Sequence, residues 1–385
     1  MQSRRIVFLI NSLDGGGAER VVSTLLNNFV EKYECHLILM ENKISYELDK
    51  RVNIIYLSHK SHDSKIVKII NTPFMAYNLF SIIKRHKFEQ IVSFMYVANY
   101  INIFIKFFTK HKTILSERVS PSSIYDNKRI SSFVHRNLIR YLYNKADKII
   151  SVSKVANLDL ERNYSINTPQ KFVIYNPYDI EKIKELSLVD IDFIIKKETT
   201  MITVGSLIPR KNHELILKAM SKLENKNINL IILGKGYQKT YLEQITKKLD
   251  IIDRVRFIDF DSNPYKYLSK SSIFVFASNA EGFPNVIAEA MCCGCCVVSS
   301  DCTSGPRELL SPSSDIEIQL SNNVDYAEYG ILYPVNDEKL LVTTLNHIFK
   351  NRDLIEYYSQ KTLTRISDFN INKIALEYEK VIFDN

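Results

Sequence analysis

Short apolar runs alternate with amphipathic stretches along most of the chain. Each apolar run has the length of a buried strand, and the amphipathic stretch after it has the spacing of a helix. Strands that alternate with helices are typical of parallel-sheet α/β domains, so the pattern predicts an α/β fold. The predicted strands are 5–11, 35–40, 52–57, 90–94, 113–115, 147–152, 200–204, 228–233, 254–258, 273–277, 296–299 and 330–334.

Several segments between the strands have a less regular pattern. Residues 64–86 are largely helical in pattern, and we expect Pro73 to interrupt that helix because proline lacks a backbone donor. Residues 181–199 form a polar crossing that is partly helical, and residues 311–328 have the composition of a long polar loop. The last helical pattern covers residues 371–383.

The most informative stretch runs from Glu281 to Gly294, directly after a predicted strand. Pro284 suits a first helical turn, and Gly294 suits the left-handed residue at a helix end. The unpaired N–H groups at the helix start, together with the helix dipole, favour an anion such as a diphosphate. Asn285 and Glu289 are four residues apart and share a helix face. The stretch therefore predicts an anion site flanked by two carboxylates.

The letters of this stretch resemble a known motif. E-G-F-P-N-V-I-A-E-A-M, followed by G, V-V-S, D-C and G-P-R-E-L-L, is similar to the nucleotide-diphosphate-sugar site of retaining glycosyltransferases of family 4, the E-x7-E group. The alternative is an ordinary strand-helix unit with two surface acids. The resemblance covers essentially the whole chain. It implies a GT-B fold, in which two Rossmann-like domains face each other across a cleft.

The resemblance also implies where the domains begin and end. It places an acceptor-side Rossmann-like domain at 1–180 and a nucleotide-sugar-binding Rossmann-like domain at 181–367. A terminal segment, 368–385, is expected to pack its helix back on the first domain. A chain of 385 residues is long enough for two domains of common size.

Three residues are the predicted catalytic groups. In the family, an arginine follows the glycine of the loop after strand 200–204, and a lysine stands five residues further on. Lys211 matches the lysine, but Ser206 replaces the arginine, and we expect Arg210 to supply the lost charge. Two cations on a leaving diphosphate offset the charge that develops as the glycosidic bond breaks. Glu281 is expected to hold the donor sugar.

The other donor contacts come from loops that follow predicted strands. In similar enzymes a carboxylate binds the ribose and a loop after the strand 254–258 holds the nucleobase, which implies Glu289 and Phe260 for these roles. Gly16 and Gly17 lie in a loop that looks like the first loop of the family, although a tight turn alone would also need glycine. The predicted donor-binding set is Gly16, Gly17, Gly205, Arg210, Lys211, Phe260, Glu281, Gly282, Phe283, Pro284, Asn285, Val286 and Glu289.

Polar residues after two strands of the first half are the acceptor-side candidates. Asn99, Glu117 and Arg118 follow strands whose carboxyl ends face the ligand crevice in such sheets. Structural capping is the alternative for all three. Many members of the family carry a histidine after the fourth strand, and none stands there in this chain. We therefore assign no histidine a catalytic role and expect His111 and His135 at the surface.

Metal binding is not expected. Of the six cysteines, five lie within residues 292–302, and the first four of these have the spacing C-C-x-C-C, which differs from the paired clusters of structural zinc sites. Buried free thiols are the expected state. Two D-x-D strings, 190–192 and 259–261, are poorly placed to bridge a metal to a diphosphate. The resemblance likewise implies no metal and no cofactor.

The net charge is +8, and the places of the basic residues in the sequence are more informative than the sum. Basic residues beside aromatic and aliphatic ones favour an anionic membrane surface or a lipid diphosphate, or else they form solvated helix faces. No apolar run is long enough for a signal peptide or a spanning helix, so we expect a cytoplasmic protein, peripheral at the inner face of the cell membrane. The two segments are 64–86, with Lys65, Lys68, Lys84, Arg85 and His86, and 104–112, with Phe104, Lys106, Phe107, Phe108, Lys110, His111 and Lys112.

These features predict a sugar transferase, and the family resemblance implies that it retains the configuration at the anomeric carbon. It would move a hexose or an N-acetylhexosamine from a UDP-sugar to a glycan acceptor, which the resemblance implies is polyprenyl-diphosphate-linked and part of bacterial surface or protein-linked glycan synthesis. A nucleotide-sugar epimerase or phosphorylase of the same shape is the alternative among enzymes, but we find no catalytic acid set or pyridoxal lysine. A nucleic-acid-binding protein would need a continuous basic stripe, whereas the lysines here are spread along the chain.

Overall fold

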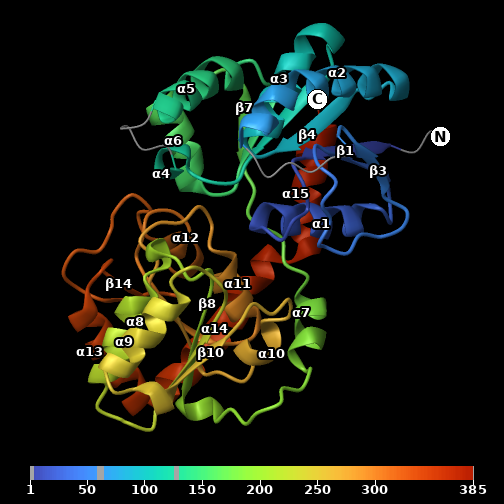
Figure 1. Cartoon of the computed structure of the whole chain (residues 1–385). Helices are drawn as coiled ribbons and strands as arrows, with labels where there is room; N and C mark the ends of the chain where they lie inside the picture. Colours follow the sequence, from blue (N-terminus) through green and yellow to red (C-terminus); the bar gives the residue numbers. More distant parts are fainter. Residues whose placement is uncertain (1–3, 59–64, 125–129, 385) are drawn as a thin grey trace. The chain divides into compact units, whose positions relative to one another are not determined.

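The computed structural model describes residues 4–58, 65–124 and 130–384, apart from the side chains of 65–70, 124 and 130–131. The chain divides into two compact units. The first is Met1–Pro177 with Ile371–Asn385, and the second is Tyr178–Asn370. Each unit has a largely parallel sheet with helices packed on it (Figure 1). This is the α/β architecture that the alternation of apolar and amphipathic stretches predicts.

The first unit has a seven-stranded sheet with the order β3-β2-β1-β4-β5-β6-β7, and its neighbouring strands are parallel. The inner strands are almost continuously buried, as strands covered on both faces are. The strands are β1 (Arg5–Ile10), β2 (Glu34–Leu39), β3 (Asn53–Tyr56), β4 (Gln90–Phe94), β5 (Lys112–Glu117), β6 (Lys148–Ser151) and β7 (Gln170–Val173). The helices are α1 (Gly17–Phe29), α2 (Lys65–His86), α3 (Tyr96–Thr109), α4 (Pro121–Ile124), α5 (Ile130–Leu138), η1 (Ile139–Tyr143), α6 (Lys154–Tyr164) and α15 (Ile371–Phe383).

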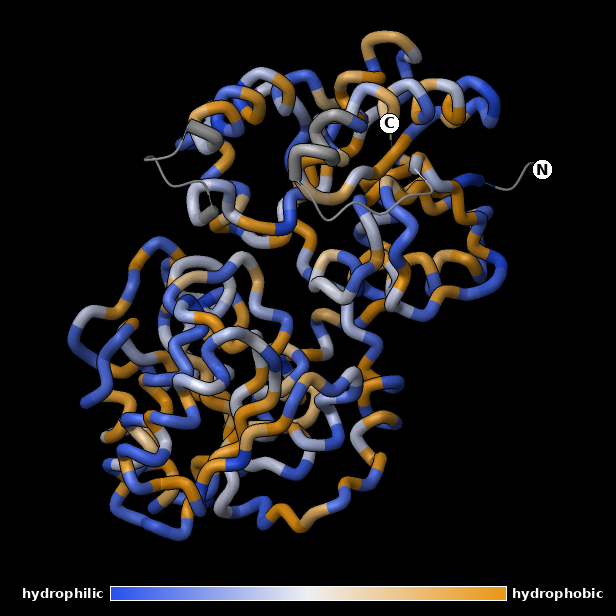
Figure 2. The backbone as a smooth tube through the Cα atoms, in the orientation of Figure 1, coloured by the Kyte–Doolittle hydropathy of each residue, from blue (hydrophilic) through white to orange (hydrophobic). Residues whose placement is uncertain are grey.

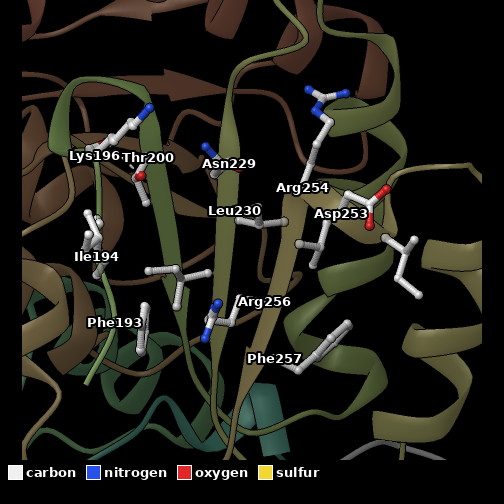
Figure 3. A pocket seen from close by; sticks show the side chains of 14 residues that line it. Phe193, Ile194, Lys196, Thr200, Asn229, Leu230, Asp253, Arg254, Arg256 and Phe257 are labelled. Atoms are coloured by element: carbon white, nitrogen blue, oxygen red, sulfur yellow. Dashed lines mark hydrogen bonds between the residues drawn. The ribbon is translucent and has the colours of Figure 1, made fainter. Parts of the chain in front are cut away.

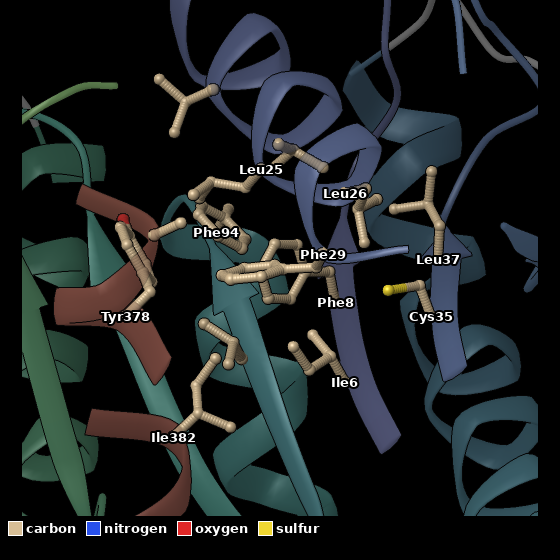
Figure 4. Packing of buried hydrophobic residues seen from close by; sticks show 14 of the residues in the cluster. Ile6, Phe8, Leu25, Leu26, Phe29, Cys35, Leu37, Phe94, Tyr378 and Ile382 are labelled. Carbon is tan, nitrogen blue, oxygen red and sulfur yellow. The ribbon is translucent and has the colours of Figure 1, made fainter. Parts of the chain in front are cut away.

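Side chains from both ends of the chain meet in the core of the first unit. The ring of Phe8 on β1 lies 6.2 Å from that of Phe29 on α1 and 4.9 Å from that of Phe94 on β4, measured between centroids. Tyr378 and Ile382 of α15 are buried in the same cluster (Figure 4). The last helix is therefore part of the first unit's core, although the whole second unit precedes it in sequence.

The second unit has a seven-stranded sheet with the order β10-β9-β8-β11-β12-β14-β13, in which β13 alone pairs antiparallel. Hydrophilic and hydrophobic residues alternate along the outer turns of this unit (Figure 2). The strands are β8 (Thr200–Val204), β9 (Asn229–Leu233), β10 (Val255–Ile258), β11 (Ile273–Phe276), β12 (Cys296–Ser300), β13 (Asp325–Tyr326) and β14 (Ile331–Tyr333). The helices are α7 (Ile180–Ser187), η2 (Lys197–Thr199), η3 (Pro209–Lys211), α8 (His213–Lys222), α9 (Lys239–Lys248), η4 (Ile252–Arg254), α10 (Tyr265–Leu268), α11 (Asn285–Cys292), α12 (Pro306–Leu310), α13 (Glu338–Lys350), α14 (Arg352–Ile366) and η5 (Ser367–Phe369).

Two expectations about these elements are wrong. α2 continues through Pro73 without a break. Its residues Met75 and Leu79 are buried in a core cluster of the first unit, and that packing outweighs the loss of one backbone hydrogen bond. The stretch 311–328 is not entirely loop, because β13 lies within it and pairs with β14.

Candidate functional site

A strand, a loop and a short helix form the stretch that the sequence singles out. β11 ends at Phe276, and α11 begins at Asn285, directly after Pro284. Gly294 lies just beyond the helix with a φ of +70°, the left-handed conformation that ends many helices. β8 and β12 flank β11 in parallel, so the loops after these three strands emerge at the same edge of the sheet. The predicted order of strand, loop, helix and strand is confirmed.

The carboxylate of Glu281 gathers two cations and a hydroxyl. Lys211 Nζ lies 2.5 Å from Glu281 Oε1, and Arg210 Nη1 lies 3.3 Å from Oε2. Ser278 Oγ donates a hydrogen bond of 2.6 Å to Oε1. The side chain of Glu281 is 8% exposed and that of Lys211 is 13% exposed, so water screens this ion pair only weakly. Because one carboxylate faces two cations, the cluster carries a net positive charge.

Both cations come from η3, the single turn that follows β8. Arg210 Nη1 also donates a hydrogen bond of 2.7 Å to Ala280 O, and its side chain is 49% exposed. Lys211 Nζ lies 5.2 Å from the centroid of the Phe276 ring, a cation–π distance. The structure thus brings the three predicted catalytic residues together at the carboxyl ends of β8 and β11, where parallel sheets bind ligands. Their roles in a reaction stay a prediction.

The loop between Glu281 and α11 rests on a tight turn after β12. Ser304 Oγ donates a hydrogen bond to Gly282 O. Gly305 has a φ of +97°, and a Cβ there would lie 2.2 Å from Pro284 Cδ and 3.2 Å from Phe283 Cα. A side chain at this position would meet both the backbone strain and the contact, so the turn requires glycine. The sequence indicated Gly282, Phe283 and Pro284 and placed Gly305 in the same motif, but it gave no sign of the contact between Gly305 and Pro284.

A buried ion pair holds that turn in place. Arg307 Nη2 lies 2.5 Å from Asp301 Oδ2, and Arg307 Nε donates a hydrogen bond of 3.1 Å to Oδ1. Leu320 N donates a hydrogen bond of 2.8 Å to the same Oδ2. The two-point contact between a guanidinium and a carboxylate fixes both the angle and the distance. It anchors the turn before α12 and part of the polar loop that follows.

The first turn of α11 contains the predicted anion-binding residues Asn285 and Val286. Asn285 Oδ1 accepts a hydrogen bond of 2.8 Å from Tyr178 OH. Glu289, one turn further along, is 3% exposed. Backbone N–H groups at a helix start point outward along the axis and suit an anion. The contacts of these residues with a diphosphate and a ribose stay predictions.

The glycine loop of the first unit stands at the start of α1. Gly16 precedes the helix, and Gly17 is its first residue. Tyr46 OH donates a hydrogen bond of 3.0 Å to Gly16 O. A Cβ at Gly16 would lie 2.2 Å from Glu19 Oε2, which a flexible side chain could relieve. Both glycines thus follow the carboxyl end of β1, and their contact with a donor stays a prediction.

Two further donor candidates lie at strand ends of the second unit. Gly205 follows β8, and its carbonyl oxygen is only 2.0 Å from where a Cβ of Gly234 would lie, so the two loops touch through their backbones. Phe260 follows β10 and is exposed, with Lys235 Nζ 5.0 Å from its ring centroid. An exposed ring beside a cation is suited to stacking on a nucleobase. No such contact is yet demonstrated for Phe260.

The acceptor-side candidates Asn99 and Glu117 lie in a buried chain of hydrogen bonds. Asn99 Nδ2 donates to Tyr143 OH at 2.9 Å, and Tyr143 OH donates to Glu117 Oε2 at 2.7 Å. Burial raises the pKa of Glu117 to about 7, although the hydrogen bond from Tyr143 acts to lower it. These contacts fit the structural alternative, because both side chains already serve protein groups. A direct contact with an acceptor stays a prediction.

Arg118 is also buried and joins several elements of the first unit. Its Nη1 donates to Ser116 Oγ at 3.3 Å and to Tyr378 OH at 3.2 Å, and its Nη2 donates to Asn176 Oδ1. The guanidinium therefore connects the end of β5 with α15 and with the residue before Pro177. This placement favours a structural role for Arg118 beside the predicted acceptor role.

The expectation that His111 lies at the surface is wrong. Its Nε2 is 2.8 Å from Asn102 Oδ1 and its Nδ1 is 2.6 Å from Thr109 Oγ1. Burial lowers the pKa of His111 to about 4, so the ring is neutral. His135 is half-buried beside Tyr100. Asn99 and Asn102 are three residues apart on the otherwise apolar helix α3. This spacing was the sequence signal for a buried network of hydrogen bonds.

The cysteines are free thiols, as the sequence predicts. Cys292, Cys295, Cys296 and Cys302 are buried, and Cys293 is half-buried. Burial raises the pKa of Cys295 and of Cys302 to about 12, so both thiols are neutral at physiological pH. Within the described residues, no three His, Cys, Asp or Glu side chains form a group that could hold a metal ion.

A cavity of about 670 Å³ lies at the opposite end of the second sheet (Figure 3). Thr200, Asn229 and Val255, the first residues of three strands, line it. Arg256 Cζ lies 4.1 Å from the centroid of the Phe193 ring at its side. Ligands of open parallel sheets bind at the carboxyl ends of the strands, where the Glu281 cluster lies. This cavity is therefore no part of the predicted donor site.

Exposed aromatic side chains gather on α2, α3, α5 and η1 of the first unit. The basic residues Lys84, Arg85 and Lys110 are exposed on α2 and at the end of α3. The side chains of 65–70, which include predicted basic residues of this surface, lie outside the described residues. Among the described helices, none is long and apolar enough to cross a membrane. The exposed aromatic residues are Phe74, Tyr77, Phe104, Phe107, Phe108, Phe133 and Tyr141.

Two family models match the chain. Residues 15–182 match the model described as Glycosyltransferase Family 4. Residues 190–365 match the model described as Glycosyl transferases group 1. The gap between the two matches falls within α7 and the crossing after it, at the start of the second unit. Each model thus matches one of the two units.

Two relatives from Campylobacter jejuni align over nearly the whole chain. One is 34% identical over 98% of this chain and 99% of its own, and is named N-acetylgalactosamine-N,N'-diacetylbacillosaminyl-diphospho-undecaprenol 4-alpha-N-acetylgalactosaminyltransferase. The other is 25% identical over 98% of each chain. It is named GalNAc-alpha-(1->4)-GalNAc-alpha-(1->3)-diNAcBac-PP-undecaprenol alpha-1,4-N-acetyl-D-galactosaminyltransferase.

Solved structures share the fold over the full length. Anabaena HepE, crystallised with UDP, matches with a TM-score of 0.78 at 17% identity, over 98% of this chain and 99% of that one. Sucrose-phosphate synthase from Thermosynechococcus elongatus matches with a TM-score of 0.79 at 16% identity, over 98% of each chain. The predicted GT-B class, with two Rossmann-like units, is confirmed.

Proposed function

Because this chain belongs to glycosyltransferase family 4, we propose that it transfers a hexose or an N-acetylhexosamine from a UDP-sugar to a glycan acceptor, with retention at the anomeric carbon. One observation carries the proposal for the donor site. Lys211 and Arg210 converge on Glu281 at the edge of the sheet where α11 begins. A cluster of two cations and one carboxylate, with a net positive charge, close to a helix start is suited to a diphosphate.

The cluster supplies what departure of a nucleoside diphosphate needs. Negative charge grows on the leaving phosphate as the glycosidic bond breaks, and pre-oriented cations stabilise that charge. Lys211 is oriented by Glu281 before a ligand arrives, so little reorganisation accompanies the reaction. The partner of Glu281 Oε2 is Arg210, which is more distant and more exposed than Lys211. We propose that this oxygen accepts a hydrogen bond from a hydroxyl of the donor sugar. The departing phosphate would take the acceptor proton, so no protein base is required.

We propose that the reaction needs no metal ion. A divalent metal in other sugar transferases neutralises the leaving diphosphate, and here Lys211, Arg210 and the N–H groups of α11 would fill that role. The carboxylates of the D-x-D string 259–261 are each paired with a lysine. Asp261 is engaged by Lys266 at 2.9 Å, and Asp259 by Lys239 at 2.6 Å.

We propose a polyprenyl-diphosphate-linked glycan as the acceptor. Both Campylobacter relatives carry an undecaprenol-linked substrate in their names. The exposed rings of Phe104, Phe107 and Phe108 on α3 are suited to the interfacial region of a bilayer, and the neighbouring Lys110 to anionic headgroups. The protein would then act in the cytoplasm, peripherally at the inner face of the cell membrane.

A donor screen tests the donor assignment. Binding and turnover of UDP-GalNAc, UDP-Gal, UDP-GlcNAc, UDP-Glc and GDP-Man would be measured with EDTA present, on wild type and Glu281→Ala. Glu338→Ala is the matched control, because Glu338 forms a surface ion pair with Lys222 in the same unit. We expect selective use of one UDP-sugar, unaffected by EDTA, retained in the control and lost in Glu281→Ala. Absence of binding to every nucleotide sugar would overturn the donor site.

Vesicle sedimentation tests the membrane surface. The variant Phe104→Ser/Phe107→Ser/Phe108→Ser should bind vesicles of anionic phospholipid at least several-fold more weakly than wild type, because it removes three rings from the interface. Tyr237→Ser/Tyr357→Ser is the control, since both residues are exposed in the second unit. Equal vesicle binding by wild type and the triple variant would exclude α3 as the contact.

A further inference from the structure

Tyr178 makes a contact that neither the family comparison nor the sequence pattern assigns. It is the first residue of the second unit and is buried. Its hydroxyl donates a hydrogen bond of 2.8 Å to Oδ1 of Asn285, the first residue of α11. We propose that Tyr178 is a positioning residue of the donor site, whose hydroxyl orients the Asn285 amide so that this side chain meets the diphosphate as a hydrogen-bond donor. The proposal rests on the proposed function.

The two ends of the Asn285 amide differ in hydrogen-bonding chemistry. An asparagine side chain has an acceptor oxygen on one side and a donor NH2 group on the other, and the two have nearly the same shape. When the oxygen of Asn285 is held by the Tyr178 hydroxyl, the NH2 group is the one turned away from Tyr178. Lys211 and Arg210 form a cationic cluster on Glu281, four residues before Asn285 in the chain, and such a cluster is suited to an anion. In the flipped amide, the oxygen would face that anion and repel it.

Tyr178 is itself held firmly enough to do this. Its backbone N donates a hydrogen bond of 2.9 Å to Phe369 O, and it forms a parallel bridge with Asn370. Pro177 precedes it, and its ring fixes the φ of Pro177 itself. A buried tyrosine has only two side-chain torsions, so fixing its backbone largely fixes the hydroxyl. The orientation of Asn285 is thus set by a group with little freedom of its own.

The same crossing also supports the donor loop at a second point. Phe369, which accepts the hydrogen bond from Tyr178, has its ring 6.2 Å from that of Phe283. Tyr178 is where the chain enters the second unit, and Phe369 lies next to where it leaves. The two crossing segments therefore contact the donor loop at Phe283 and the helix start at Asn285. In the proposal, the effect of Tyr178 on the donor passes through its hydrogen bond to Asn285.

The test compares two tyrosine-to-phenylalanine variants. Tyr178→Phe removes only the hydroxyl, and we expect the dissociation constant of UDP, measured by calorimetry, to rise about 3- to 10-fold, the worth of one hydrogen bond. Tyr358→Phe is the control, because its hydroxyl donates to Ala327 O at 3.1 Å elsewhere in the second unit. The control should bind UDP like wild type. Melting temperatures of both variants show whether the fold is retained.

Two Asn285 variants distinguish positioning from general packing. In an Asn285→Ala background, Tyr178→Phe should weaken UDP binding no further, because the amide that it orients is gone. Asn285→Asp still accepts the Tyr178 hydrogen bond but cannot donate to phosphate, so it should bind UDP more weakly than Tyr178→Phe does. Additive effects of Tyr178→Phe and Asn285→Ala, or wild-type UDP binding by Tyr178→Phe, would overturn the proposal.

The same measurements keep this proposal separate from the proposed function. If wild type binds UDP and Tyr178→Phe binds it equally well, the positioning role fails and the glycosyltransferase donor site stands. If wild type binds no uridine nucleotide at all, the assignment of the donor fails and the role of Tyr178 fails with it. The enzyme would be used full-length in both cases, with EDTA present.

Discussion

Lys211 Nζ lies 2.5 Å from Glu281 Oε1, although 70 residues separate the two in the sequence. Glu281 follows β11 and Lys211 follows β8, and these strands are neighbours in the sheet. Parallel pairing brings the loops at their carboxyl ends together, so the ion pair is a direct result of the strand order. Because both side chains are mostly buried, each one depends on the other for a charged partner.

Lys211→Ala should lower kcat/KM for the UDP-sugar about 100-fold or more, since it removes a cation from the leaving diphosphate. It should also lower the free energy of unfolding by up to about 3 kcal/mol, because Glu281 loses its closest cation. Lys211→Arg keeps the charge but not the compact ammonium, so it should restore stability more than rate. Steady-state kinetics and urea unfolding measure the two effects. A near wild-type rate in Lys211→Ala would remove this residue from the catalytic set.

Arg210→Ala should affect donor use while leaving the fold intact. The guanidinium is half exposed, so its ion pair with Glu281 contributes at most about 1 kcal/mol to stability. If Arg210 supplies the charge lost at Ser206, the KM for the donor should rise about 10-fold. Arg256→Ala is the control, because Arg256 is an exposed arginine at the other end of the same sheet.

Ser206→Arg offers a complementary gain-of-function test of Arg210. This substitution restores the arginine at the position where the resembled family has it. In the Arg210→Ala background it should recover most of the lost donor affinity, measured as KM. An unchanged KM in Arg210→Ala alone would show that the charge at Arg210 is not used.

Glu117→Gln should change how stability depends on pH. The folded protein keeps the Glu117 proton up to a pKa of about 7, whereas the unfolded chain ionises near 4.5. The folded state therefore holds the extra proton between these values, and stability falls as pH rises through that window. The variant should match wild type at pH 4, below the unfolded-state pKa, and exceed it by up to about 3 kcal/mol at pH 8.

Tyr143→Phe is the partner variant for that measurement. The Tyr143 hydroxyl donates to Glu117 Oε2 and favours its ionised form. Its removal should raise the pKa of Glu117 further, so the loss of stability with rising pH should continue above pH 7. Denaturant unfolding at pH 5, 7 and 9 measures this. Parallel pH curves for wild type, Glu117→Gln and Tyr143→Phe would contradict a titrating, buried Glu117.

Gly305→Ala should weaken both stability and UDP binding. The new Cβ would lie 2.2 Å from Pro284 Cδ, so the loop that precedes α11 must move. Gly294→Ala is a matched control in the same unit. It also has a positive φ, +70°, but its nearest neighbour is the Ser359 hydroxyl at 3.3 Å. Backbone strain should lower the free energy of unfolding of both variants by about 1 kcal/mol or more, and both should unfold at a lower temperature. Only Gly305→Ala should also raise the dissociation constant of UDP.

The sequence by itself determined the elements and the main motif of this protein. The strands follow from apolar runs, and α11 from a proline before it and a glycine after it, because these signals act over a few residues of backbone. The letters from Glu281 to Gly294 likewise identified the glycosyltransferase family without any coordinates. The motif specifies about a dozen residue types within a short segment, so it can be recognised without knowledge of long-range contacts.

Tertiary structure alone decided which side chains meet and which are buried. Tyr178 reaches Asn285 across 107 residues, and Gly305 packs against Pro284, because strand order and loop geometry bring them together. α2 continues through Pro73 and His111 is buried, because packing and internal hydrogen bonds outweigh local preference. Local sequence reports backbone preference, whereas long-range contacts depend on how the whole chain packs.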